Sequence, residues 1–268
     1  MLGKLMKYEF KASGRVLLPL YGAVIVTAIL SGLAAKGVDY SFADIGIFRL
    51  LTVVIMLVYC VLMVASCAVG FIIAIIRFKK NLFDSEGYLM HTLPVNAAAH
   101  IFSKLIVASV YEIVGVLVAL LSMFLVALPG ISFSNLDFAD MVFQLEQLFA
   151  MYGDAIVLYG IEALILGFVG LLFANLIVYA AISIGHSTNS HKVRNSFGAY
   201  IVLYIAVQIV NSVGLVSTPL RLLVENADSG GIYGASPFMI VLIFVNLAYA
   251  AVFFLITRYF MKNKLNLQ

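Results

Sequence analysis

Residues 46–76 read GIFRLLTVVIMLVYCVLMVASCAVGFIIAII, a run of 31 residues in which Arg49 is the single charged side chain. A helix needs about 20 mostly apolar residues to cross the hydrocarbon core of a bilayer. A strand is excluded because the run is long and apolar on every side, without the alternation of a half-buried strand. The run therefore predicts a transmembrane helix, about 46 Å long if fully helical, which must tilt or project from the membrane.

The rest of the chain has the same apolar character. Of its 268 residues, 64% are apolar and 11% are charged, and the net charge is +3. Soluble domains are about 45–50% apolar and about 25% charged, so this chain has too few polar side chains to coat a water-soluble globule. The composition excludes a soluble enzyme, a disordered chain and a nucleic-acid-binding protein.

Six stretches are long and apolar enough to cross a membrane. They cover residues 16–35, 46–76, 103–128, 158–184, 197–218 and 237–257. The sequence therefore predicts an all-α fold, a polytopic membrane protein with six transmembrane helices that form a single domain over residues 1–268.

Lys and Arg residues favour one side of this predicted bundle. Of the 16 in the chain, 13 fall in the two terminal segments and in the loops after the second and fourth spans. Loops rich in Lys and Arg stay in the cytoplasm, so both termini are expected to be cytoplasmic. The loop at residues 129–157 has no Lys or Arg and is expected outside.

The first 15 residues have one charged face. On a helical wheel, Lys4, Lys7, Lys11 and Arg15 fall within a sector of about 80°. Apolar side chains occupy the opposite side: Leu2, Leu5, Met6, Phe10, Ala12 and Val16. The pattern predicts an amphipathic helix over residues 1–15 that lies in the cytoplasmic interface and contacts membrane lipid.

The most polar cytoplasmic stretch is residues 77–95, RFKKNLFDSEGYLMHTLPV. Asp84 and Glu86 are flanked there by apolar side chains, and Pro94 prevents a simple helical continuation. The apolar residues are Leu82, Phe83, Tyr88, Leu89 and Leu93. Asn96 is expected to cap a helix that begins at Ala97. The stretch predicts a short helix with an apolar face, which either docks on a cytoplasmic partner or folds back on the bundle as an ordinary loop.

The outer loop at residues 129–157 has its own helical pattern. Apolar side chains recur at helical spacing over residues 136–152. This pattern predicts an outer amphipathic helix that lies on the membrane or caps the bundle.

Ionisable side chains inside spans are costly and often functional. Glu112 is expected to be a hydrogen-bonded structural residue, and Glu162 an interfacial carboxylate that reaches water. The alternative for either residue is a role at the substrate or the gate. A central cavity lined by Tyr59, Met63, Tyr111 and Phe124 would be apolar. Amide side chains within spans either contact substrate or simply hold helices together. The substrate and gating candidates are Glu112, Tyr59, Tyr111, Asn175, Gln208 and Asn211.

The sequence contains no catalytic constellation. It lacks His-Glu-x-x-His, Gly-x-Ser-x-Gly and the phosphate-binding Gly-x-x-x-x-Gly-Lys-Ser/Thr. Cys and His residues do not have metal-ligand spacing, and the four histidines, in cytoplasmic loops or at their edges, are expected to be solvated. We therefore expect neither an enzyme nor a metal or other cofactor in this chain, and any active transport must draw its energy from another subunit.

Two segments resemble small ABC-transporter permeases of the bacterial export class. They are MLGKLMKYEFKASGRVLLPLYG at residues 1–22 and NLFDSEGYLMHTLPVNAAAHIFSK at residues 81–104. Through the six-span plan the likeness extends over nearly the whole chain, although the large ectodomain of some antimicrobial-peptide resistance permeases is missing.

The resemblance implies a dimer of this chain with two separate ATPase subunits, which bind the ATP and Mg. It makes residues 1–15 the interfacial connector and residues 77–95 the coupling segment, seated in a cleft of the ATPase. The residues expected to couple the two subunits are Phe83, Asp84, Glu86, Tyr88, Leu89 and Leu93.

The sequence thus leads to an expected function, the membrane subunit of an ATP-driven exporter in a bacterial cell membrane. An apolar cavity suits an amphipathic peptide or a lipid-like molecule, and the resemblance extends to exporters of bacteriocins and small amphipathic toxins. The alternative is a non-transporting membrane scaffold or immunity protein, which needs neither ATPase docking nor alternating access.

Overall fold

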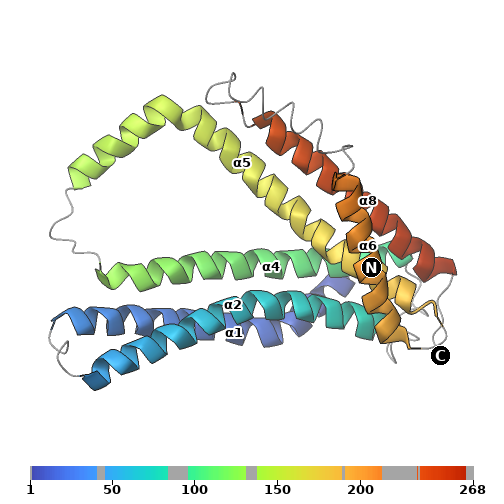
Figure 1. Cartoon of the computed structure of the whole chain (residues 1–268), viewed down its shortest axis with the longest axis horizontal. Coiled ribbons are helices and arrows are strands. Elements are labelled where there is room, and N and C mark those ends of the chain that lie inside the picture. The colour runs from blue at the N-terminus through green and yellow to red at the C-terminus, as the bar shows by residue number, and fades with distance from the viewer. Residues whose placement is uncertain are drawn as a thin grey trace. The chain divides into compact units, whose positions relative to one another are not determined.

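The structure, a computed structural model, describes residues 2–40, 46–83, 96–130, 138–188, 191–212, 234 and 236–263 (Figure 1). The elements in this part of the chain are helices: α1 Leu2–Tyr40, α2 Gly46–Phe83, α4 Ala97–Ala127, the 3-10 turn η1 Leu128–Gly130, α5 Phe138–Gly185, α6 Lys192–Ser212 and α8 Ser236–Asn263. Within these residues, 6 helices are long and apolar enough to cross a membrane. The predicted all-α, multi-pass membrane fold is confirmed.

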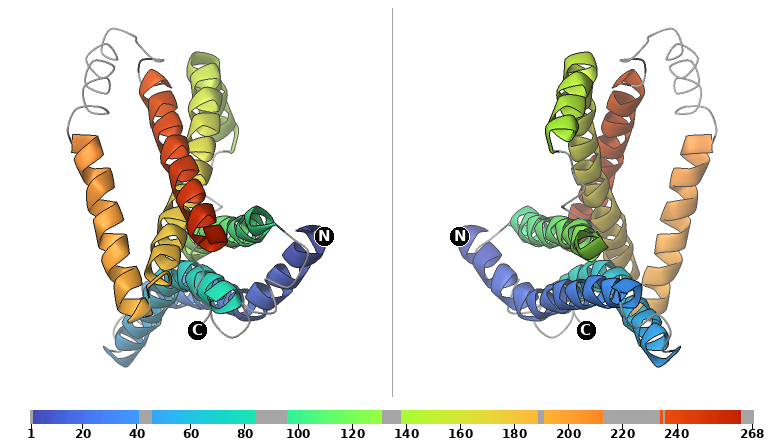
Figure 2. Two further views of the ribbon diagram at one scale, coloured as in Figure 1. Left: turned by 90° about the vertical axis from the view of Figure 1, so that its right-hand side faces the viewer. Right: turned by 90° about the vertical axis from the view of Figure 1, so that its left-hand side faces the viewer.

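The predicted interfacial helix and the first span are one continuous helix. α1 has 39 residues, about 58 Å of axial rise, and it is bent, so that its N-terminal part runs in a different direction from the rest (Figure 2). Pro19 lies inside α1 and removes one backbone donor, which explains a kink. Because the chain has no stop signal at residues 15–16, the helix continues through them instead of ending there.

α2 extends beyond the predicted end of its span. It has 38 residues, about 57 Å of axial rise, against a hydrocarbon thickness of about 30 Å. Residues 77–83, expected to start a separate cytoplasmic helix, are its last two turns. Lys80 lies in the final turn, where a cation complements the helix dipole. The remainder of the predicted coupling segment, residues 84–95, lies outside the described residues.

The predicted outer helix is present, but it is not a separate element. α5 runs without interruption for 48 residues, from Phe138 to Gly185, and it changes direction along its length (Figure 1). The apolar side chains of its first part are exposed: Val142, Phe143, Leu145, Leu148, Phe149 and Met151. Within the second unit defined below, this part of α5 therefore covers no core.

The first residues of α4 and α6 can be compared with the starts predicted from the sequence. α4 begins at Ala97, as predicted, and the Asn96 carbonyl accepts hydrogen bonds from the Ala99 and His100 amides at 2.9 and 3.4 Å. α6 begins at Lys192, five residues before the predicted start of the fifth span, and ends at Ser212. Residues 213–218, the predicted end of that span, lie outside the described residues.

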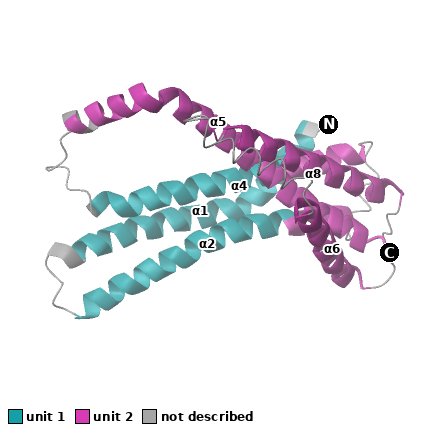
Figure 3. Ribbon diagram, turned by 45° about the horizontal axis from the view of Figure 1, so that its top comes forward, with its two compact units in different colours: residues 1–74, 106–137 teal, residues 75–105, 138–268 magenta. Residues whose placement is uncertain are grey.

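The chain divides into two compact units (Figure 3). Unit 1 comprises residues 1–74 and 106–137, and unit 2 comprises residues 75–105 and 138–268. α2 and α4 each contribute residues to both units. Each unit has its own apolar core, and the two cores are described separately below.

Unit 1 packs α1, α2 and α4 together. Its core contains Val24 and Ala28 from α1 and Tyr59 from α2, with side chains of α4 against them. Two hydroxyls of this unit bond to main-chain carbonyls of a neighbouring helix: Ser31 to Ile55 and Thr52 to Ala34, both at 3.4 Å. These contacts hold α1 against α2.

Unit 2 has the larger core. The Phe78 ring of α2 stacks on the Tyr179 ring of α5, with the planes 4° apart and the centroids 3.8 Å apart. Ile101 and Leu105 of α4 join the same core, as do side chains from α6 and α8. The last turns of α2 and the first turns of α4 are therefore buried with α5.

Candidate functional site

Two tyrosines cross between α1 and α4 in unit 1. The Tyr21 hydroxyl donates to the main-chain carbonyl of Tyr111 at 2.8 Å, and the Tyr111 hydroxyl donates to the carbonyl of Phe10 at 2.8 Å. The Phe10 and Tyr111 rings also contact each other, with centroids 5.7 Å apart. We call Tyr21 and Tyr111 the tyrosine pair.

Each hydroxyl of the tyrosine pair lies over a glycine. A Cβ on Gly14 would lie 2.5 Å from the Tyr111 hydroxyl oxygen, and a Cβ on Gly115 would lie 3.0 Å from the Tyr21 oxygen. Each accepting carbonyl lies four residues before its glycine, one helical turn away. Because glycine has no side chain, the hydroxyl can reach this carbonyl. A larger residue at Gly14 would push the Tyr111 hydroxyl off its acceptor.

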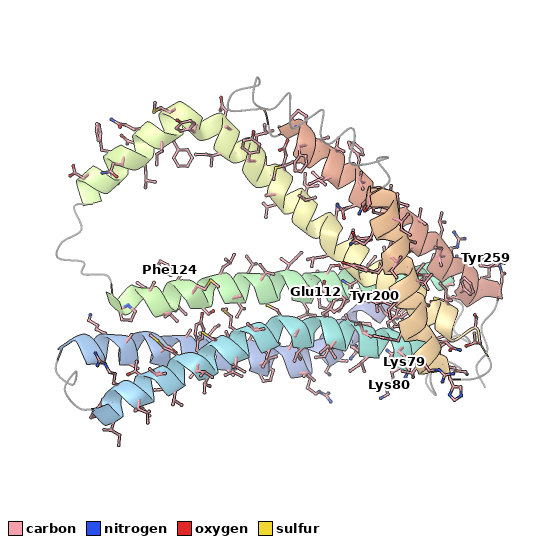
Figure 4. The ribbon with its side chains drawn as sticks, viewed as in Figure 1. Lys79, Lys80, Glu112, Phe124, Tyr200 and Tyr259 are labelled. Atoms are coloured by element: carbon pink, nitrogen blue, oxygen red, sulfur yellow. The ribbon has the colours of Figure 1, made fainter. Side chains whose placement is uncertain are left out.

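Glu112 belongs to the same region of unit 1. It follows Tyr111 on α4 (Figure 4), is partly buried, and its Oε1 is inaccessible to solvent. Glu112 and Cys67 are close enough to the Tyr21 hydroxyl to interact with it electrostatically. The structure therefore brings together two predicted residues, Tyr111 and Glu112, with Tyr21, which was not among the predicted site residues.

The residues predicted to line an apolar cavity are dispersed. Tyr59 is buried, with its hydroxyl 3.0 Å from that of Ser122 and 3.4 Å from the Met63 sulfur. Phe124 is 57% exposed and projects from α4 on the side away from α1 and α2 (Figure 4). Tyr59 and Met63 thus belong to the core, whereas Phe124 lies on an exposed face, so these residues do not form one lining.

The three predicted amides have three different environments in unit 2. Asn175 is fully buried and its Nδ2 donates to the Leu171 carbonyl of its own helix at 3.0 Å. Asn211 on α6 accepts a hydrogen bond of 2.6 Å from the Tyr249 hydroxyl on α8. Gln208 is exposed. Asn211 holds two helices together, one of the two roles considered for it.

Glu162 is buried, contrary to the expectation that it reaches water. It is 6% exposed, and its Oε1 accepts a hydrogen bond from the Ser236 hydroxyl. Because Ser236 is the first residue of α8, this bond ties the middle of α5 to the start of α8. The sequence places Glu162 near the end of a span, where it would reach water at the membrane surface. In the folded chain, the start of α8 covers this position.

Phe83 is the one described residue among the six expected to couple the chain to an ATPase. It is 7% exposed and packs against Phe78 and the ring of His186, with centroids 5.8 and 4.9 Å apart. Its side chain therefore belongs to the core of unit 2. Asp84, Glu86, Tyr88, Leu89 and Leu93 lie outside the described residues.

Two histidines that were expected to be solvated are buried. His100 and His186 are 2% and 3% exposed. The His186 Nδ1 lies 3.0 Å from the Ile182 carbonyl and 3.5 Å from the Ser196 hydroxyl on α6. His186 therefore takes part in the packing where α5 ends and α6 begins.

The basic residues of the N-terminal helix are placed as the helical wheel predicts. Lys4, Lys7, Lys11 and Arg15 are all exposed. The buried side of this segment contains Glu9 and Ser13. Leu5, Met6, Phe10 and Ala12 are partly buried, but Val16, assigned to the same face, is exposed.

Among the described residues, no group of three or more His, Cys, Asp or Glu side chains could hold a metal ion. No family model, no curated protein and no solved structure matches the chain.

Proposed function

We propose that the chain is the membrane subunit of an ATP-driven exporter in a bacterial cell membrane, with both termini in the cytoplasm. Two copies would work with two ATPase subunits. The proposal rests on the six apolar helices, on the asymmetry of Lys and Arg between loops, and on the resemblance of residues 1–22 and 81–104 to export permeases. Since the sequence has no phosphate-binding loop, the ATP would be hydrolysed on the partner.

One observation carries the proposal. The segment at residues 84–95 connects two helix ends that are buried in the same core. Before it come Phe78, Leu82 and Phe83, and after it come Ile101 and Leu105. A force on this segment would therefore act directly on the packing of α5, through the stacked rings of Phe78 and Tyr179. Packed interiors transmit such displacements because they have little free volume.

The chemistry of the segment suits a docking surface. Asp84 and Glu86 supply negative charge beside Tyr88 and Leu89. In the mechanism we propose, ATP binding draws the two ATPase subunits together, and the segment carries that motion to α2 and α4. The helix bundle then changes between inward-open and closed or outward-open states, and hydrolysis resets it.

The proposed substrate is an amphipathic peptide or a lipid-like molecule. The spans contain few charged side chains, and the two carboxylates within them, Glu112 and Glu162, are partly or fully buried. Sugars and inorganic ions require more polar groups than these spans offer. An amphipathic molecule instead finds apolar surface, with a small number of polar contacts.

The test is a paired substitution in the docking segment. Glu86→Ala with Tyr88→Ala should abolish co-purification of the ATPase, or leave its activity insensitive to this chain. The matched control is Glu146→Ala with Tyr152→Ala, which changes the same residue types at exposed positions of α5. Retention of a fully coupled ATPase by the segment variant would refute the docking proposal.

A further inference from the structure

The exposed face of α1 is cationic as far as Arg15 and apolar beyond it. Lys4, Lys7, Lys11 and Arg15 share this face and are exposed. On the same face beyond Arg15 come exposed apolar side chains: Leu18, Ile29 and Leu33. The apolar section ends at Lys36, which is again exposed and on the same side of the helix.

The length of this apolar section matches a membrane. Arg15 and Lys36 are 21 residues apart, about 32 Å along the helix axis. The hydrocarbon core of a bilayer is about 30 Å thick. A helix section of this length could cross the hydrocarbon with Arg15 and Lys36 at its two boundaries, and the basic residues before Arg15 would then begin at its edge.

The orientation of the basic segment is fixed by unit 1. The Tyr111 hydroxyl bonds to the Phe10 carbonyl at 2.8 Å and lies over Gly14, inside the basic segment. Glu9 and Ser13 are buried on the side away from the cations. Because α1 is bent (Figure 2), this segment runs in a different direction from the part that carries Leu18 to Leu33.

We propose that Lys4, Lys7, Lys11 and Arg15, the basic face, bind the anionic headgroups of phospholipids in the adjoining leaflet. Lys4 and Arg15, the ends of the basic face, are 11 residues apart, about 16 Å along the helix, long enough to contact several headgroups. An anionic leaflet attracts cations that lie within a Debye length of its surface. Continuity with the apolar section favours lipid over an acidic protein, since the cations start where the hydrocarbon ends. This proposal does not depend on the proposed ATPase partner.

The test uses a fluorescent probe beside the basic face. Cys60 and Cys67 are free and exposed, so both are first replaced by Ala. Tyr8, an exposed neighbour of the basic face, is replaced by Cys and labelled with an environment-sensitive dye. The full chain is placed in phosphatidylcholine nanodiscs with or without phosphatidylglycerol, together with lipids that carry a quencher in the headgroup. Phosphatidylglycerol should increase the quenching, and added salt should reverse the increase.

Substitution of the four cations by Gln should remove this response. Each lost charge should lower the apparent affinity for phosphatidylglycerol about fivefold. The matched control replaces four other exposed cations, Arg49, Arg194, Arg258 and Lys262, by Gln, and should keep the response. Quenching that does not depend on phosphatidylglycerol, or an equal loss in both quadruple variants, would overturn the proposal.

Discussion

At the scale of single residues, the contacts that join α1 to α4 depend on two hydroxyls and two glycines. The Tyr111 and Tyr21 hydroxyls each donate a hydrogen bond to a main-chain carbonyl of the other helix. A Cβ at Gly14 would lie 2.5 Å from the Tyr111 oxygen, but 3.5 Å from the next atom of that ring. The steric conflict would thus come from the hydroxyl alone.

Gly14→Ala should destabilise the protein by about 1–3 kcal/mol through overpacking. Tyr111→Phe should cost about 0.5–1.5 kcal/mol, the usual worth of one hydrogen bond. In the double variant the conflict disappears, so its loss of stability should be smaller than the sum of the two single losses. Thermal unfolding in detergent measures all three.

Gly22→Ala is the control for that cycle, because a Cβ at Gly22 meets nothing within 4 Å. It should leave the apparent Tm unchanged or raise it slightly, since Ala favours a helix more than Gly does. Strictly additive effects of Gly14→Ala and Tyr111→Phe would contradict the geometry of the tyrosine pair.

The same residues show what the sequence can and cannot predict about a site. Glu112 and Tyr111 stand out in the sequence as polar groups within a span, and they do lie in one cluster. Tyr21 is also a tyrosine within a predicted span, but it was not selected, because its role depends on which helices pack together. The buried positions of Glu162 and His186 were missed for the same reason, since both are covered by other helices.

At the scale of elements, a helix boundary with a local sequence signal was predicted better than a boundary inferred from polarity alone. Asn96 before three alanines is a local signal, and α4 begins there. Residues 15–16 and 77–83 have no stop signal, so α1 and α2 continue through boundaries that were inferred from polarity alone. α5 likewise continues past Gly153, because one glycine weakens a helix without ending it.

The end of α2 carries a prediction at this scale. Phe78→Ala should cost about 3–5 kcal/mol, because the ring is fully buried and stacked on Tyr179. The control is Phe124→Ala, which removes an exposed ring from α4 and should change stability by about 0.5 kcal/mol or less. Unfolding by a chemical denaturant in detergent compares them, and similar losses for the two variants would show that the end of α2 is not part of the core.

At the scale of the whole molecule, composition and hydropathy were sufficient to predict the six helices. The boundary between the two units was not predictable, because it divides α2 and α4 at positions without any change in residue type. The orientation in the membrane rests on 13 of 16 Lys and Arg residues lying on one side. It predicts which positions a reagent outside the cell can reach.

Single cysteines in a Cys60→Ala, Cys67→Ala background test that orientation. Lys36→Cys and Glu146→Cys should react with a membrane-impermeant thiol reagent in intact cells, because both positions are exposed and expected outside. Lys4→Cys and Lys262→Cys, exposed near the two ends of the chain, should react only after the membrane is permeabilised. Labelling of either terminal position in intact cells would contradict the assignment.

The exporter proposal requires that this chain works with an ATPase subunit. The most direct test is native mass spectrometry of the wild-type protein, extracted from its own membrane in mild detergent. An exporter subunit should be released as an assembly of two copies of the chain with two ATPase subunits, identified by their peptides. A chain that is released alone or as a simple dimer, under conditions that preserve other membrane complexes, would contradict the exporter proposal and favour a scaffold or immunity protein.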